Sequence, residues 1–434
     1  MDAIIAQLTN GAAIGTGIKK LTPAAAKLLG GTIPPFLILL TLGQQNALFG
    51  SYPDHKDVAP LAIFTAAFGI FFLAHLGIWA INTSRGHKFH VSLGLAFYNL
   101  VRTLGFGFRI GWGLDIMLVN FGLASEVFLI AAPVILVSCN LILAQRIFTW
   151  RHPVGGNSAI FWTFMNASYA SVVGVVIMSV VSGVVPYIYY LSERRYTMCK
   201  NVFRVAAILN CVYVASTVSL ILLAYVFKPT TKDKNITVYQ PWWLDSFSTF
   251  HFVPKGAAKE AERTFMARDH HSRYAVRVIA AHQQHYNTVE ESSDVPDRSR
   301  PNLSTNHSIV IVTVTTFFLL LAVIFRTIAC FGNKTKATET WVHHPVLMYV
   351  MWGALEVLIN VIYLVFRVDL RFYKPDRLPK DVQVQTGIQT PSEPYGQHEY
   401  SNEKLVSHLH EVTNVGRISS AEKERVSQNS QMYV

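Results

Sequence analysis

Two long apolar runs lie back to back in residues 90–150, and no other feature constrains the fold as strongly. A run of about 20 mostly apolar residues has the length of helix that crosses the hydrocarbon core of a bilayer. The runs, residues 91–112 and 116–143, are joined by a short glycine-containing hinge at residues 111–115. Because consecutive elements joined by so short a connection lie side by side, the sequence predicts two adjacent antiparallel membrane-spanning helices.

The composition places the whole chain in the same class. Of its 434 residues, 51% are hydrophobic and 15% are charged, whereas soluble proteins carry roughly 25% charged residues. Five further apolar runs are present, so we predict an all-α fold, a polytopic membrane protein with a seven-transmembrane helix bundle. The predicted spans are residues 58–81, 91–112, 116–143, 159–181 (with an extension to 190 as an alternative), 203–227, 308–330 and 346–366.

Polar and basic segments divide the chain into five predicted parts. These are an N-terminal extracellular or lumenal region (1–57), helices one to five (58–227), a long cytoplasmic loop (228–306), helices six and seven (307–367) and a disordered cytoplasmic tail (368–434). The N-terminal region contains an apolar piece at residues 33–42 that is too short for a span and suits the membrane interface. The long loop contains an amphipathic stretch at residues 255–285, which predicts a surface helix.

The distribution of Lys and Arg predicts that the N-terminus lies outside and the C-terminus in the cytoplasm of a plasma-membrane or endomembrane protein, because the long loop and the tail are basic. One basic cluster opposes this orientation, since it would lie outside. It consists of Arg194, Arg195, Lys200 and Arg204. Three N-x-S/T triplets in the long loop offer a test, because a sugar on any of them would invert the topology. They begin at Asn235, Asn302 and Asn306.

Charged and amide side chains inside the spans are the candidate functional residues, since such groups are costly in a bilayer core and face other helices or a wet cavity. The candidates are Arg102, Arg109, Glu126, Asn140, Glu356 and Asn360. Arg102 and Glu126 both lie roughly 15 Å below the same surface if their spans are regular helices. Glu356 lies at a similar depth in the last span. We therefore predict that Arg102 forms a buried ion pair, with Glu126 on the adjacent helix or with Glu356.

Two interpretations of these residues remain open. In the first, they line a polar cavity open to the outer leaflet, with Arg109 and Arg326 at the rim and Arg102 in a charged floor. Such a cavity suits an anionic lipid or amphiphile, because the guanidinium group binds two oxygens of a phosphate or carboxylate. In the second, the Arg102 pair only fixes the register of the helices, and Arg109 and Arg326 extend to the membrane surface.

The sequence gives little indication of metal binding, cofactor binding or catalysis. The four cysteines form no CxxC pair and no span carries a His and carboxylate set, so we predict no metal, no cofactor and no enzymatic activity. Cys199 and Cys330 would both lie near the outer surface, where a disulfide is an alternative to the two separate thiols that we expect. The net charge of +11 suits an anionic membrane surface, so the predicted partners are membrane lipids and not nucleic acid.

Several motifs lie where the spans meet the membrane surfaces. They are Phe108-Arg109-Ile110, Asn140-Leu141-Ile142-Leu143-Ala144-Gln145-Arg146, Arg151-His152-Pro153, Trp242-Trp243 and Phe325-Arg326. With these motifs, residues 50–370 resemble a fungal seven-transmembrane family of unassigned function, itself distantly similar to the lipid-translocating exporter (resistance-to-aminocholesterol) family. The resemblance implies a seven-helix fold and a role in moving lipids or amphiphiles.

Two functions compete at this point. The first is a translocator or modulator of lipids or amphiphiles that uses a charged cavity within the bundle. The second is a seven-helix receptor or sensor that signals through its long loop and tail. The chain has no GxxxxGK[ST] loop, so the sequence does not indicate ATP-driven pumping by this chain.

Overall fold

The computed structural model describes residues 11–156, 158–228, 230, 249–252, 255 and 305–372. The predicted surface helix at 255–285, the tail after 372, the Trp242-Trp243 motif and the triplets at Asn235 and Asn302 lie outside these residues, apart from Lys255 itself. Asn306, the third triplet, lies in the first turn of a helix and not in a loop. Residues 368–371, which were predicted to begin the disordered tail, form a short helix, so this boundary was wrong. The rest of the loop and of the tail stays a prediction.

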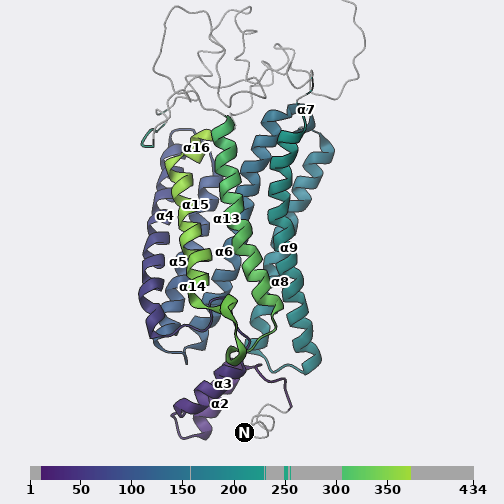
Figure 1. Cartoon of the computed structure of the whole chain (residues 1–434). Helices are drawn as coiled ribbons and strands as arrows, with labels where there is room; N and C mark the ends of the chain where they lie inside the picture. The colour runs from purple at the N-terminus through teal and green to yellow at the C-terminus, as the bar shows by residue number, and fades with distance from the viewer. Residues whose placement is uncertain are drawn as a thin grey trace, which may run out of the picture. The chain divides into compact units, whose positions relative to one another are not determined.

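Within the residues that the structure describes, seven long apolar helices form the bundle, which confirms the predicted fold class. Six of them are continuous: α4 (Val58–Ser84), α5 (His90–Leu114), α6 (Val119–Arg151), α8 (Ala159–Ile188), α9 (Glu193–Val226) and α13 (Thr305–Phe331). The seventh consists of α14 (Pro345–Met348), a π-helical turn η5 (Tyr349–Ala354) and α15 (Leu355–Val365). All run roughly along one axis, and neighbours in the sequence lie side by side at the α4–α5–α6 edge (Figure 1).

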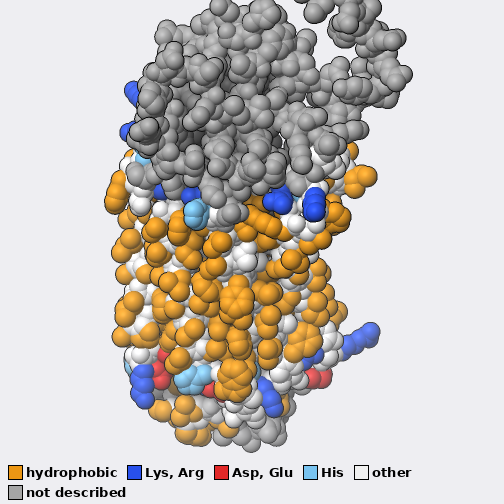
Figure 2. Space-filling view, turned by 45° about the horizontal axis from the view of Figure 1, so that its top comes forward, with side chains coloured by type: hydrophobic (Ala, Val, Ile, Leu, Met, Phe, Trp, Pro, Cys, Tyr) orange, Lys and Arg blue, Asp and Glu red, His pale blue; other side chains and the backbone are white. Residues whose placement is uncertain are grey.

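The outer surface of the bundle explains why these helices suit a membrane. Figure 2 shows a broad band of hydrophobic side chains, with Lys and Arg at its two borders. Large apolar side chains such as Ile63, Ile70 and Leu73 of α4 are about two-thirds exposed. Water would strongly disfavour this much exposed apolar surface, but lipid chains accept it. The chain is a multi-pass membrane protein.

The bundle has two ends. The N-terminal end carries α2 (Ile18–Leu28) and α3 (Pro35–Gln44), and the C-terminal end carries α16 (Val368–Arg371), as Figure 1 shows. Helix α3 is apolar but too short to span a membrane, as predicted for residues 33–42. Which end faces the cytoplasm stays a prediction.

The basic cluster predicted as an outer loop is helical. Helix α9 begins at Glu193, ten residues before the predicted start, and contains Arg194, Arg195, Lys200 and Arg204. The prediction was wrong because charged residues ended the hydropathy run, although Arg and Lys are good helix formers that extend from a span into the interface. Lys200 and Arg204 thereby come to lie on the inner side of the N-terminal end, where they line a cavity.

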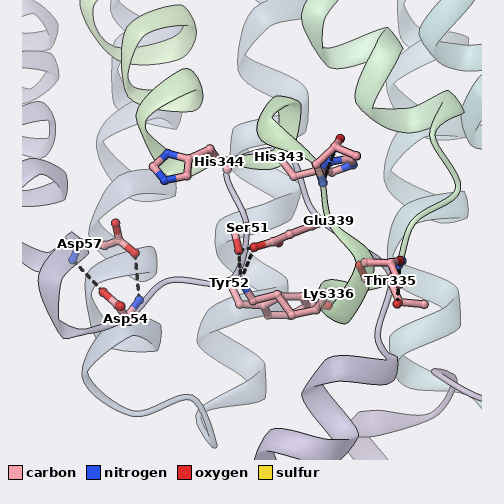
Figure 3. A network of polar contacts seen from close by, with 12 residues as sticks. Ser51, Tyr52, Asp54, Asp57, Thr335, Lys336, Glu339, His343 and His344 are labelled. Carbon is pink, nitrogen blue, oxygen red and sulfur yellow. Dashed lines mark hydrogen bonds and ion pairs between the residues drawn. The ribbon is translucent and has the colours of Figure 1, made fainter.

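A compact cap closes the N-terminal end of the bundle. We use "the cap" for residues 45–57, which contain η1 (His55–Asp57), and residues 332–344, which contain η3 (Lys336–Thr338) and η4 (Trp341–His343). The two segments are joined by backbone hydrogen bonds from Ala47 N to Lys334 O (2.9 Å) and from Lys336 N to Gln45 O (2.9 Å). Their side chains form the polar network of Figure 3.

Candidate functional site

Arg102 and Glu356 form an ion pair in the centre of the bundle. Arg102 Nε lies 2.6 Å from Glu356 Oε2, and Nη2 contacts Oε1, so the guanidinium binds the carboxylate with two parallel hydrogen bonds. Tyr98 OH donates to the same carboxylate, and Arg102 Nη1 donates to the Leu129 carbonyl at 3.2 Å. Both side chains of the pair are at most 1% exposed, so the charges of Arg102 and Glu356 compensate each other inside the bundle and not through water.

Of the two partners predicted for Arg102, the structure has Glu356 and not Glu126, and the position of the helix ends explains why. Helix α5 continues to Leu114 and α6 begins only at Val119. Glu126 therefore lies seven residues into α6, whereas Arg102 lies twelve residues and Arg109 five residues before the end of α5. At 1.5 Å per residue, the depth of Glu126 matches that of Arg109 and not that of Arg102. Glu356, eleven residues after the start of α14, does match Arg102.

Arg109 joins Glu126 to the cap. Its Nη1 lies 2.6 Å from Glu126 Oε1, and its Nη2 donates to the carbonyls of Gly50 (3.0 Å) and Ser51. Gly50 and Ser51 have positive φ angles of 89° and 56°, and this left-handed turn points both carbonyls at the guanidinium. A side chain at position 50 would collide with Met348, so glycine is required there.

Ser51, whose carbonyl accepts from Arg109, also contacts the other half of the cap. Figure 3 shows Ser51 together with Lys336 and Glu339. Ser51 Oγ donates to Glu339 Oε2 at 2.9 Å, and Lys336 Nζ lies 2.6 Å from Glu339 Oε1. The cap is thus fixed to α5 and α6 through one buried arginine.

The two asparagine candidates also bond within the bundle. Asn140 on α6 donates to Thr316 Oγ1 (2.7 Å) and accepts from Thr315 (3.1 Å) and Tyr363 OH (2.9 Å). Asn360 accepts from Asn99 Nδ2 at 2.8 Å and donates to the Glu356 carbonyl. Both connect helices that are distant in the sequence, which is the usual role of polar side chains between membrane helices.

The structure does not place Arg102 in the floor of an open cavity, because its side chain is fully buried. Of the six candidate residues, only Glu126 lines either of the two cavities described next. The other five belong to the internal networks above. The residues that do face a cavity come largely from the helix ends.

A basic cavity of about 110 Å³ lies at the N-terminal end, between the cap and helices α6, α8, α9 and α13. We define "the basic cavity" by Lys200, Arg204, Arg326 and Lys334 together with Glu126 and Trp352. Among its described lining residues Glu126 is the sole carboxylate, and it is already paired with Arg109. The remaining four cations give this cavity a strong positive potential.

Arg326 dominates the electrostatics of the basic cavity. It is 5% exposed and its guanidinium lies over the rings of Phe203 (5.6 Å) and Trp352 (5.7 Å). Within the described part of the chain no carboxylate or carbonyl accepts a hydrogen bond from it. An arginine buried without a hydrogen-bond acceptor is costly, because the charge loses its hydration and the two aromatic rings replace only part of it.

An apolar cavity of about 380 Å³ adjoins the basic cavity. We define "the apolar cavity" by Leu21 of α2, Phe36 and Leu37 of α3, and Trp112, Met117 and Leu123 around the start of α6. Burial, followed by the neighbouring Tyr187 hydroxyl, raises the pKa of Tyr52 in its wall well above the ordinary value, so this phenol is neutral. The cavity is therefore suited to an uncharged, apolar group.

Two residues, Glu126 and Tyr187, line both cavities. The cavities thus share a wall at one point: a cation-rich space lies on one side and a hydrocarbon-like space on the other. An amphiphile has the same division between an anionic group and an apolar chain.

Three of the cations in the basic cavity were not among the candidate residues predicted from the sequence. Arg326 was placed at the rim of a cavity or, as the alternative, extending to the membrane surface, and Lys200 and Arg204 were placed in a loop. One signal could have identified Arg326: it lies five residues before the end of α13, the same distance as Arg109 from the end of α5. Two arginines at one depth on inner helix faces indicate a common polar layer.

The remaining predictions concern cysteines and metals. All four cysteines are free, so Cys199 and Cys330 are separate thiols as expected. Within the described ranges, no group of three or more His, Cys, Asp or Glu side chains could hold a metal ion.

Comparison with known proteins gives one match. The family described as "Protein of unknown function (DUF3112)" matches residues 153–373, a segment that runs from the end of α6 to just beyond α16. No curated protein and no solved structure matches the chain. Because the matched segment covers 221 of the 434 residues, the chain belongs to this family, for which no function is assigned.

Proposed function

We propose that this membrane protein binds an anionic lipid or amphiphile, with the anionic group in the basic cavity and the chain in the apolar cavity, and translocates it or modulates its distribution. The observation that carries the proposal is Arg326, which is 95% buried, faces the basic cavity and lacks an acceptor. A phosphate or carboxylate at this position would accept two parallel hydrogen bonds from its guanidinium.

The energetics favour an anionic over a zwitterionic ligand. A hydrogen bond to a charged group contributes about 1.5–3 kcal/mol. In the basic cavity this bond forms beside aromatic rings and not in water. Lys200, Arg204 and Lys334 add attraction for negative charge, whereas a choline group would meet the same cations and be repelled.

The apolar cavity supplies the second part of the affinity. Its volume of about 380 Å³ lies within the range of small-molecule sites, roughly 300–1,000 Å³. Each methylene group buried there contributes about 0.8 kcal/mol. A ligand with both parts is therefore expected to bind more tightly than either inorganic phosphate or an uncharged alkyl chain.

The choice between translocation and sensing rests on other grounds. The fungal family that the sequence resembles is itself distantly similar to lipid-translocating exporters. This distant similarity supports translocation, which remains a prediction. A receptor or sensor, the alternative, would bind the same ligand without moving it. That the chain is not an enzyme also stays a prediction.

Binding is tested with the purified full chain in non-ionic detergent, by the fluorescence anisotropy of NBD-labelled phosphatidic acid. Arg326→Gln is expected to weaken binding roughly 10- to 150-fold, the equivalent of 1.5–3 kcal/mol. The matched control is Arg195→Gln, which removes the same charge from an exposed position of the same end. Unchanged affinity in Arg326→Gln, or an equal loss in Arg195→Gln, would contradict the proposal.

Translocation is tested separately in proteoliposomes. Wild-type protein is expected to expose NBD-labelled phosphatidic acid of the inner leaflet to dithionite, and Arg326→Gln is expected to abolish this. Binding without translocation would favour the sensor over the translocator.

A further inference from the structure

Helix α4 carries a buried polar stripe that neither the ion pairs nor the cavities use. His75, Trp79, Asn82 and Thr83 recur at four and three or four residues, so they share one face of the helix. His75 and Asn82 are at most 2% exposed. The rest of α4 is strongly apolar, so each of these side chains needs a physical explanation.

The stripe is short of hydrogen-bond partners. Four of its polar atoms, His75 Nε2, Trp79 Nε1, Asn82 Oδ1 and Thr83 Oγ1, are buried without any partner, as is Asn99 Oδ1 on α5. A buried unsatisfied polar atom costs about 1–3 kcal/mol, and native proteins leave few of them. Five such atoms on two packed helices indicate internal water, which typically bridges groups of this kind.

The stripe connects the middle of the bundle with its C-terminal end. At the inner end, His75 lies beside Asn360, which is bonded to Asn99 and to the Glu356 carbonyl. At the other end, Asn82 Nδ2 donates to Asp369 Oδ2 at 2.7 Å. Asp369 forms a two-point ion pair with Arg367 just beyond the last span.

We propose that this stripe holds a file of internal water molecules and that His75 takes up a proton through it from the C-terminal end. His75 and Asn82 are seven residues apart, or about 10 Å along the helix. About three water molecules at hydrogen-bond spacing would cover that distance. The partnerless Nε1 of Trp79 lies between the two and the partnerless Oγ1 of Thr83 lies next to Asn82, so both atoms would hold waters in place.

Proton transfer along such a file is balanced at each step. A hydronium near Asp369 gives a proton to the next water, each water releases a different proton as it accepts one, and the last O–H bond breaks as an N–H bond forms on the imidazole. The result is one imidazolium and an unchanged number of waters.

The other charged and titratable groups near α4 have partners or lie towards the opposite end of the bundle, so His75 is the group that accepts the proton. On elements packed against α4 they are Arg102, Tyr98 and Glu356, joined to one another, and Asp369, joined to Arg367. Arg109, Asp57 and Tyr349 lie towards the opposite end, and His87 bonds the Asp369 carbonyl.

Water in the file is tested by X-ray hydroxyl-radical footprinting of the full chain in nanodiscs, which oxidises side chains next to ordered water. We expect rapid oxidation of His75 and Trp79. Met165, fully buried on α8 and more reactive by its chemistry, is the dry control and should stay unmodified. In the variant Asn82→Leu, oxidation of His75 should fall to the level of Met165. Protection of both His75 and Trp79 in the wild type overturns the water file.

Proton uptake is tested by NMR of the chain with ¹⁵N-labelled histidine, with His75→Gln to identify the resonance. The imidazole signals of His75 should shift to those of imidazolium as the pH is lowered, while the protein stays folded. A neutral imidazole down to the pH of unfolding overturns the proton uptake. Neither test depends on a bound amphiphile.

Discussion

The partner of Arg102 can be identified by two double-mutant cycles. The first combines Arg102→Met with Glu356→Leu, and the second combines Arg102→Met with Glu126→Leu. Both replacements are apolar and close in volume, so each removes charge without opening a large cavity. The structure pairs Arg102 with Glu356 and pairs Glu126 with Arg109.

The magnitude follows from the burial of the pair. Glu356 accepts two hydrogen bonds from Arg102 and one from Tyr98, and its side chain is 1% exposed. Either single replacement leaves an uncompensated buried charge, which costs about 3–5 kcal/mol of the free energy of unfolding. The double variant removes both charges and should lie close to the wild type. Because the two single costs add and the double variant costs almost nothing, the coupling energy of the first cycle is expected to be about 6–10 kcal/mol in magnitude.

The second cycle is the matched control. Arg102 and Glu126 share no hydrogen bond, so their effects should add within about 0.5 kcal/mol. The assay is the free energy of unfolding in mixed micelles during an SDS titration, followed by tryptophan fluorescence. Equal coupling in the two cycles, or a coupling below about 1 kcal/mol in the first, would refute the assignment of the core ion pair.

Two further predictions concern the other networks. Arg109→Met leaves Glu126 unpaired and frees the Gly50 and Ser51 carbonyls, so amide hydrogen exchange in residues 45–57 should accelerate. Unchanged exchange would count against the role of Arg109 in fixing the cap. Asn140→Leu removes three interhelical hydrogen bonds of about 0.6 kcal/mol each, so the free energy of unfolding should fall by about 2 kcal/mol. Ser138→Ala, a control two residues away in the same helix, should change it by less than half as much.

Much of the bundle could be predicted from hydropathy alone, because the length of an apolar run is set by the bilayer. The errors concentrate at helix ends, where hydropathy carries little information. The start of α9 at Glu193 was missed because Arg194 and Arg195 are polar yet helical. A shift of two or three residues at the α5–α6 hinge was enough to make Glu126 a candidate partner of Arg102, although it pairs with Arg109.

The site was harder to predict than the fold, for a physical reason. Depth along a helix follows from residue counting, but whether a side chain faces a partner or a cavity depends on helix rotation and packing. Arg102 and Arg326 have similar sequence surroundings, yet Arg102 meets a carboxylate and Arg326 meets two aromatic rings beside a cavity. The cavities also depend on the cap and on α2 and α3, which hydropathy does not place.

The most direct test of the account is an electron cryo-microscopy map of the full chain in nanodiscs that contain phosphatidic acid. We expect density for a phosphate next to Arg326, continuing past Glu126 and Tyr187 as an acyl chain into the apolar cavity. Two empty cavities, or a protein carboxylate bonded to the Arg326 guanidinium, would contradict it.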